Sequence, residues 1–210
     1  MGRNEKILFV LLMGSLWGAL ELFGGDTFRA CGVPNKSAYL FGLGLIIVYA
    51  SKRVVDFAGS VAIMALIAGL FKIASSHFYA CQFAAVVMNG VIFDVMYRMF
   101  KNQLNASIIY RIIAAPILAY VSFACFAFLA AFVFKEPGWA TGNWSPIFDY
   151  LSSSALIATA FSIVTINAGY YLGNVLRSSF VSKRIDFSSS AFRMTSLVLV
   201  GVIWIAGQIY

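Results

Sequence analysis

Residues 6–24 read KILFVLLMGSLWGALELFG, and only Lys6 and Glu21 in this run carry a charge. A helix needs roughly 20 predominantly apolar residues to cross a bilayer, so the run predicts a transmembrane helix. An ionisable group at membrane depth is costly, and by default it indicates a functional site. The alternative for Glu21 is a place at the headgroup boundary, where its charge costs little.

The whole chain has the composition of an integral membrane protein. Of its 210 residues, 61% are hydrophobic and only 11% are charged, which leaves little for a separate water-soluble domain. No alternating strand pattern competes with helix, so residues 1–210 are predicted to form one all-α polytopic domain, a bundle of six to seven transmembrane helices. The apolar runs that predict spans are 6–24, 36–50, 54–73, 78–98, 107–134, 147–176 and 192–210.

The lysines and arginines predict the orientation of this bundle. Cytoplasmic loops carry the excess of basic residues, so the N-terminus is predicted to be cytoplasmic and, with seven spans, the C-terminus lies outside. The net charge of +7 is explained by these loops, and no nucleic-acid partner is expected. If every span crosses, only four of the 15 basic residues lie on the outer side: Arg29, Lys36, Lys72 and Lys135.

Most of the polar and aromatic side chains that could bind a solute are predicted to gather at the outer face. The first and third spans end there, the fourth begins there, and the loop between the fifth and sixth carries two tryptophans. Aromatic walls with a few convergent polar groups are typical of a small-solute pocket. The candidate substrate-binding residues are Glu21, Asp26, Lys72, His77, Gln82, Trp139 and Trp144.

Each of these candidates has a simpler explanation that the sequence leaves open. Glu21 and Lys72 can pair as a structural salt bridge, and His77 can be an ordinary exposed histidine. Tryptophans anchor at membrane interfaces whether or not they bind a solute, so the loop of Trp139 and Trp144 is either a lid or an anchor.

Three polar residues, Asn89, Asp94 and Asn167, are predicted to lie deeper. Side-chain amides commonly link transmembrane helices, and Asp94 can pair with Arg98 one turn further on, so structural roles are expected. The sequence shows neither a chain of carboxylates across the membrane nor a G-x-x-x-x-G-K-[ST] loop. The chain is therefore expected to need partners that supply energy.

Dispersed thiols and a single histidine argue against an enzyme. With one histidine and three scattered cysteines, we predict no metal site, no cofactor and no catalytic residue. A carboxylate-only mechanism using Glu21 and Asp26 is the weaker alternative. Cys31 and Cys81 are both predicted near the outer face, and they can form a disulfide if that compartment is oxidising and the distance allows it.

Small residues form a smooth ridge along the first span. Gly14 and Gly18 lie four residues apart, and Ser15 and Ala19 repeat this spacing. Such a ridge lets another helix approach closely in lipid. It indicates either packing within the same bundle or a contact with a second membrane subunit.

Three short segments resemble the substrate-capture (S) subunits of energy-coupling-factor transporters. They are LWGALELFGG at 16–25, GLFKI at 69–73 and NGVIFDVMYR at 89–98. The resemblance implies a bacterial inner-membrane subunit that binds a vitamin, a vitamin precursor or a metal ion. It also implies a membrane scaffold subunit and two ATPases as partners. The scaffold would contact the ridge of Gly14, Ser15, Gly18 and Ala19.

That family has six helices with both ends inside, whereas the apolar runs here number seven. Residues 192–210 would then be an appended helix. The sequence thus predicts a non-catalytic subunit that captures a small solute for uptake. The alternative is a structural or assembly subunit of a larger membrane complex.

Overall fold

The computed structural model describes residues 2–73, 80–139, 144–182 and 190–209, and every regular element in these ranges is helical. The first helix is continuous through α1 (Arg3–Ala19), the π-helical segment η1 (Leu20–Gly24) and α2 (Gly25–Ala30). It is followed by α3 (Lys36–Val54), α4 (Ser60–Ile73) and α5 (Ala80–Ala106). Next come α6 (Ile108–Phe128) with its π-helical end η2 (Leu129–Val133), then α7 (Ser145–Tyr150), η3 (Leu151–Ala155) and α8 (Leu156–Val181), and finally α9 (Ser190–Ile209).

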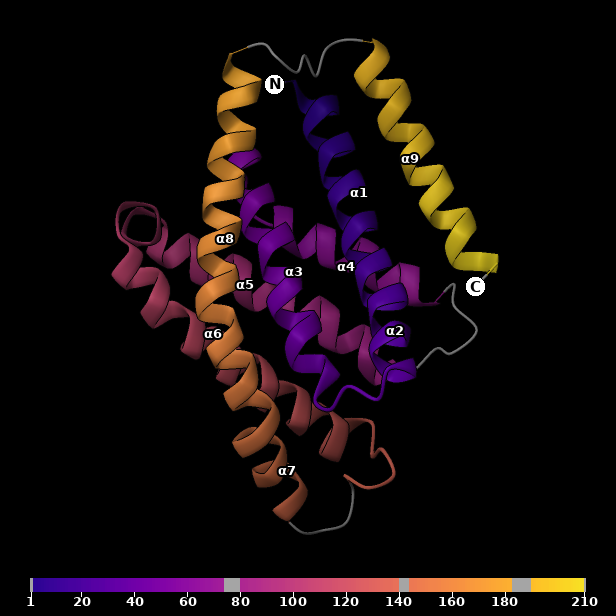
Figure 1. Ribbon diagram of the computed structural model, residues 1–210, viewed down its shortest axis with the longest axis vertical. Coiled ribbons are helices and arrows are strands. Elements are labelled where there is room, and N and C mark those ends of the chain that lie inside the picture. Colours follow the sequence, from indigo (N-terminus) through magenta and orange to yellow (C-terminus); the bar gives the residue numbers. More distant parts are fainter. Residues whose placement is uncertain (1, 74–79, 140–143, 183–189, 210) are drawn as a thin grey trace.

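Six of these helical stretches are long and apolar enough to cross a membrane, counting only the described residues. The prediction of an all-α polytopic membrane protein is confirmed. Figure 1 shows α1, the end of α8 and the start of α9 at one end of the bundle, with α7 and the connection from α2 to α3 at the other. We call these the N-terminal end and the cavity end.

The third predicted span, 54–73, is shorter in the structure, because α4 begins only at Ser60. Its 14 residues extend about 21 Å at about 1.5 Å per residue, less than the roughly 30 Å of a bilayer core. The preceding turn contains Gly59 at φ +84°, a backbone conformation that favours glycine. The Gly59 amide donates to Asp94 Oδ2 at 2.5 Å, which fixes the turn against α5. Short as it is, α4 starts beside Lys52 and ends beside Glu21.

Close helix contacts depend on small residues, as expected in a membrane. On α8, a Cβ at Gly169 would meet the Ile46 backbone at 3.0 Å, so this glycine lets α8 approach α3. On α1, a Cβ at Gly14 would meet Ile67 at 2.9 Å, and one at Gly18 would meet Phe71 at 2.6 Å.

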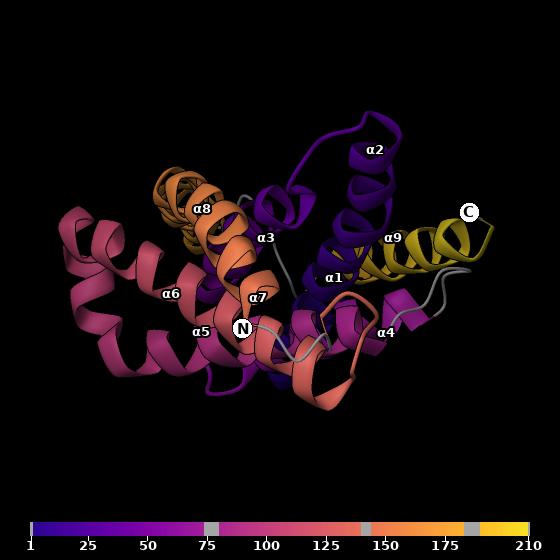
Figure 2. The ribbon, with the colours of Figure 1, turned by 90° about the horizontal axis from the view of Figure 1, so that it is seen from below.

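The ridge of Gly14, Ser15, Gly18 and Ala19 therefore packs within the chain. The Trp204 indole of α9 donates to Ser15 Oγ at 3.0 Å, and the first three ridge residues are buried. Of the two interpretations of this ridge, packing inside the bundle is the one that the structure displays; an open surface for a second subunit is not present there. Figures 1 and 2 show α9 at one edge of the bundle and the α5–α6 hairpin at the other.

Candidate functional site

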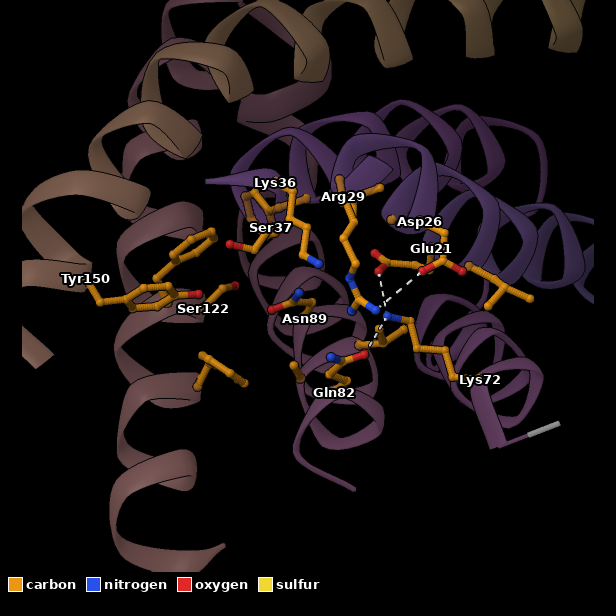
Figure 3. A pocket seen from close by; sticks show the side chains of 18 residues that line it. Glu21, Asp26, Arg29, Lys36, Ser37, Lys72, Gln82, Asn89, Ser122 and Tyr150 are labelled. Carbon is orange, nitrogen blue, oxygen red and sulfur yellow. Dashed lines mark hydrogen bonds and ion pairs between the residues drawn. The ribbon is translucent and has the colours of Figure 1, made fainter. Parts of the chain in front are cut away.

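A cavity of about 250 Å³ opens at the cavity end of the bundle, between η1, α2, α3, α4, α5, α6 and α7. Its volume is below the roughly 300–1,000 Å³ typical of drug-sized ligand sites, so it suits a small solute. Figure 3 shows that the polar lining residues are unevenly spread. Charged groups gather on one side, and Tyr150 lies on the other.

The charged side is built from helix ends that meet at this end of the bundle. Lys72, near the end of α4, places its Nζ 3.3 Å from Glu21 Oε2, and it also donates to Gln82 Oε1 at 3.3 Å. Further along the same helix, Arg29 Nη1 lies 3.9 Å from Asp26 Oδ1. The salt bridge between Glu21 and Lys72, which the sequence left open as a structural explanation, is therefore present. The pair nevertheless lies in the wall of a cavity.

Lys36 adds a third cation to this wall. It is the first residue of α3 and follows Asn35, whose φ of +52° turns the chain back into the bundle. Its ammonium points toward the other charged groups in Figure 3, and within the described ranges it has no ion-pair partner. Three cations therefore face two carboxylates, which leaves one uncompensated positive charge.

The opposite side of the cavity is aromatic. Phe123 of α6 stacks on Tyr150 with ring centroids 5.2 Å apart and an interplanar angle of 20°. Phe41 contacts Phe123 edge-on at 5.6 Å, and Phe126 lies 5.7 Å from Tyr150. These rings form an aromatic wall, to which Tyr150 also contributes a hydroxyl, and aromatic rings pair favourably with other rings.

Two polar side chains, Asn89 and Ser122, lie between the charged and aromatic sides (Figure 3). Ser122 is only 1% exposed, and its hydroxyl has no hydrogen-bond partner among the residues that the structure describes. Asn89 is half-buried and makes no side-chain hydrogen bond in the same part of the chain. Three other buried groups, Trp17 Nε1, Thr159 Oγ1 and Ser162 Oγ, also have no partner among the described residues, so what distinguishes Ser122 is its place in the cavity wall.

The structure brings four of the seven predicted site residues, Glu21, Asp26, Lys72 and Gln82, into the cavity wall. Trp139 lies behind it, 5.0 Å from Tyr150. Trp144 is 58% exposed and contacts Phe132 rather than the cavity, so its predicted binding role is not supported by its position. His77 lies outside the described residues.

Sequence reasoning missed or misplaced several lining residues. Arg29 and Lys36 were visible only as outer charges, and nothing in the sequence distinguishes Ser122 from other helical serines. Asn89 was expected to link helices through its amide, but it faces the cavity instead. The sequence does carry one signal for this position. Asn89 lies two turns beyond Gln82 on one helix, so both side chains lie on the same face.

The thiols show no sign of the possible disulfide. Cys31 is exposed, Cys81 is buried, and both are free, as is Cys125. Within the described ranges, no three His, Cys, Asp or Glu side chains form a group that could hold a metal ion.

A second polar region lies at the N-terminal end, around Lys52. The Lys52 ammonium, 3% exposed, donates to Asp94 Oδ1 at 2.6 Å, to Ser60 Oγ at 3.0 Å and to the Phe57 carbonyl at 2.8 Å. Its three donors are all used. The expected Asp94–Arg98 pair is wrong: Asp94 turns to Lys52 and the Gly59 amide on neighbouring elements. We call Lys52, Phe57, Gly59, Ser60 and Asp94 the Lys52 cluster.

Arg111 is satisfied in a similar way beside the Lys52 cluster. Its Nε donates to Asn167 Oδ1 at 2.8 Å, its Nη1 donates to the Leu104 carbonyl at 2.7 Å, and its guanidinium lies 3.8 Å from the centre of the Tyr170 ring. Asn167 therefore links α8 to α6, which agrees with the structural role predicted for it. These contacts lock helices together and enclose no described cavity.

Comparison of the chain with protein-family models, curated proteins and solved structures gives no match. The functional argument therefore rests on the cavity and its residues.

Proposed function

We propose that this protein is the substrate-capture subunit of an uptake transporter in a bacterial inner membrane. The observation that carries the proposal is the cavity of about 250 Å³, whose wall combines charged groups, an aromatic surface and an unsatisfied buried hydroxyl. In the Lys52 cluster, by contrast, the three donors of the ammonium are all paired inside the chain.

The cavity lies at the end opposite the N-terminus. With the N-terminus cytoplasmic, as the basic residues predict, the solute enters from outside. The solute binds between the charged and aromatic sides, and a membrane scaffold with two ATPases supplies the energy for its release inward. The aromatic wall favours an organic solute of the vitamin or precursor class over a metal ion.

Purification from the native host tests this proposal. The full chain carries an affinity tag, is extracted in mild detergent, and is examined by mass spectrometry for co-purifying proteins and small molecules. We expect a membrane scaffold, two ATPases and a stoichiometric organic solute.

A pair of variants on α5 ties the solute to the cavity. Ala85→Leu places a larger side chain in the cavity wall, whereas Ala80→Leu changes an exposed position on the same helix. The solute should be lost from the first variant and kept by the second. Recovery of other complex subunits without any small molecule would instead support the structural or assembly role.

A further inference from the structure

We propose, on the basis of the capture function above, that the solute is a small aromatic carboxylate with a polar ring substituent. Its carboxylate binds at Lys36, its ring packs against Phe123 and Tyr150, and its substituent hydrogen-bonds to Ser122. Each of these three contacts follows from a different property of the cavity wall.

The charge of the wall selects a monoanion. Lys72 and Arg29 already lie beside carboxylates, whereas Lys36 has no ion-pair partner among the described residues. A single carboxylate would complete this arrangement through charge-assisted hydrogen bonds. A cationic solute would add to the excess positive charge, and a dianion would reverse it.

The aromatic side selects a flat ring. Phe123 and Tyr150 stack on each other in the cavity wall, Phe41 contacts Phe123 edge-on, and Phe126 lies tilted against Tyr150. Rings pair with such walls in offset-stacked or edge-to-face geometry, beyond the gain from burying apolar area.

The Ser122 hydroxyl selects a polar group on the solute at the point between the charged and aromatic sides of the cavity. It is buried in the wall and points toward the centre of the cavity in Figure 3, with no described partner. Burying an unsatisfied hydroxyl costs stability, and a ligand atom that pairs with it removes that cost in the bound state.

Calorimetric titration of the purified full chain in nanodiscs tests the assignment. The probes are 3-hydroxybenzoate, benzoate, the primary amide of each, 3-hydroxybenzylamine and acetate. We expect 3-hydroxybenzoate to bind about tenfold or more tightly than 3-hydroxybenzamide, a ratio that one charge-assisted contact can supply. Benzoate should be intermediate, and acetate should be weakest.

Variants assign the contacts. Lys36→Gln should abolish the preference for carboxylate over amide, and Lys36→Arg should keep it. Lys135→Gln, which removes an exposed cation outside the cavity wall, should change nothing. Ser122→Ala should reduce 3-hydroxybenzoate to the affinity of benzoate. Its control is Ser162→Ala, which removes another unsatisfied buried hydroxyl that does not line the cavity.

The outcomes separate this inference from the capture function. Tighter binding of the amides, of 3-hydroxybenzylamine or of acetate overturns the substrate class and leaves capture standing. If none of the six probes binds, the proposed substrate class is also overturned. The capture function then depends on whether a solute co-purifies from the host. If no solute co-purifies either, both proposals fail.

Discussion

Two buried polar regions at opposite ends of this bundle use similar residue types in different ways. In the Lys52 cluster, one ammonium meets a carboxylate, a hydroxyl and a carbonyl, and all three of its donors are paired. Around the cavity, three cations face two carboxylates, and Ser122 has no described partner. The first region is complete within the chain, whereas the second has hydrogen-bonding capacity left for another molecule.

Whether the hydrogen-bonding groups of a buried region are all paired within the chain is therefore a better guide to function here than the mere presence of charge at membrane depth. Buried ionisable residues in membranes are often functional. Lys52, Asp94 and Arg111 are as buried as Glu21, yet their contacts are explained by helix packing alone. Substitutions that remove one group from each region should respond differently, and the following predictions run from the largest effect to the smallest.

The largest loss of stability is expected from Lys52→Met. The substitution leaves Asp94 buried without its cation, and breaking a buried ion pair in this way typically costs about 3–5 kcal/mol. The matched control is Lys101→Met, which breaks an ion pair between Lys101 and Asp56 whose side chains are 50% and 33% exposed. Thermal denaturation in detergent should show a large fall for the first variant and little change for the second. Equal effects would mean that the Lys52 cluster is not a closed structural unit.

A smaller loss is expected from Lys72→Met at the cavity. Glu21 loses its ion-pair partner, but its carboxylate faces a cavity that also contains Arg29 and Lys36. Loss of a hydrogen bond to a charged group typically costs about 1.5–3 kcal/mol, less than the Lys52 substitution. The same denaturation measurement compares the two. A cost as large as that of Lys52→Met would make Glu21–Lys72 a closed structural pair and remove the distinction between the regions.

The α1–α4 contact connects the two regions, since α4 begins in the Lys52 cluster and ends at Lys72. Gly18→Ala should destabilise this contact, because its Cβ would lie 2.6 Å from Phe71 Cβ. Overpacking costs about 1–3 kcal/mol, and one methyl group should fall at the lower end. Gly201→Ala is the control, as its Cβ meets nothing within 4 Å. If Gly18→Ala is as well tolerated as the control, the ridge is not tightly packed against α4.

The sequence predicted the all-α polytopic architecture because hydropathy reports directly on helices long and apolar enough to cross a membrane. It also brought Glu21, Asp26, Lys72 and Gln82 to one end, since alternation of spans determines which helix ends meet. The predicted span 36–50 left Lys52 beyond the helix, because a charge near the end of an apolar run normally marks its boundary. Only the structure shows that Lys52 is in the last turn of α3 and turns inward to Asp94.

The remaining site residues depend on helix rotation, which the sequence did not determine. A serine or asparagine in a transmembrane helix can face lipid, a neighbouring helix or a cavity, and the apolar pattern is too uniform to distinguish these. Ser122 and Asn89 were unpredictable for this reason. Trp144 was misplaced because an aromatic residue in an outer loop has the same sequence signature whether it closes a pocket or contacts the interface.

The smallest effect on stability, and the finest test of the comparison, is expected from two serine substitutions. Ser60→Ala removes a hydroxyl that accepts from Lys52, and it should cost about 1 kcal/mol, as a typical buried hydrogen bond does. Ser122→Ala removes a buried hydroxyl with no described partner, so in the absence of solute it should cost no stability and should raise it if anything. Denaturant titration of both variants measures the difference. If Ser122→Ala is the more damaging of the two, its hydroxyl has a structural bond within the protein, and the cavity loses the group that most clearly separates it from the Lys52 cluster.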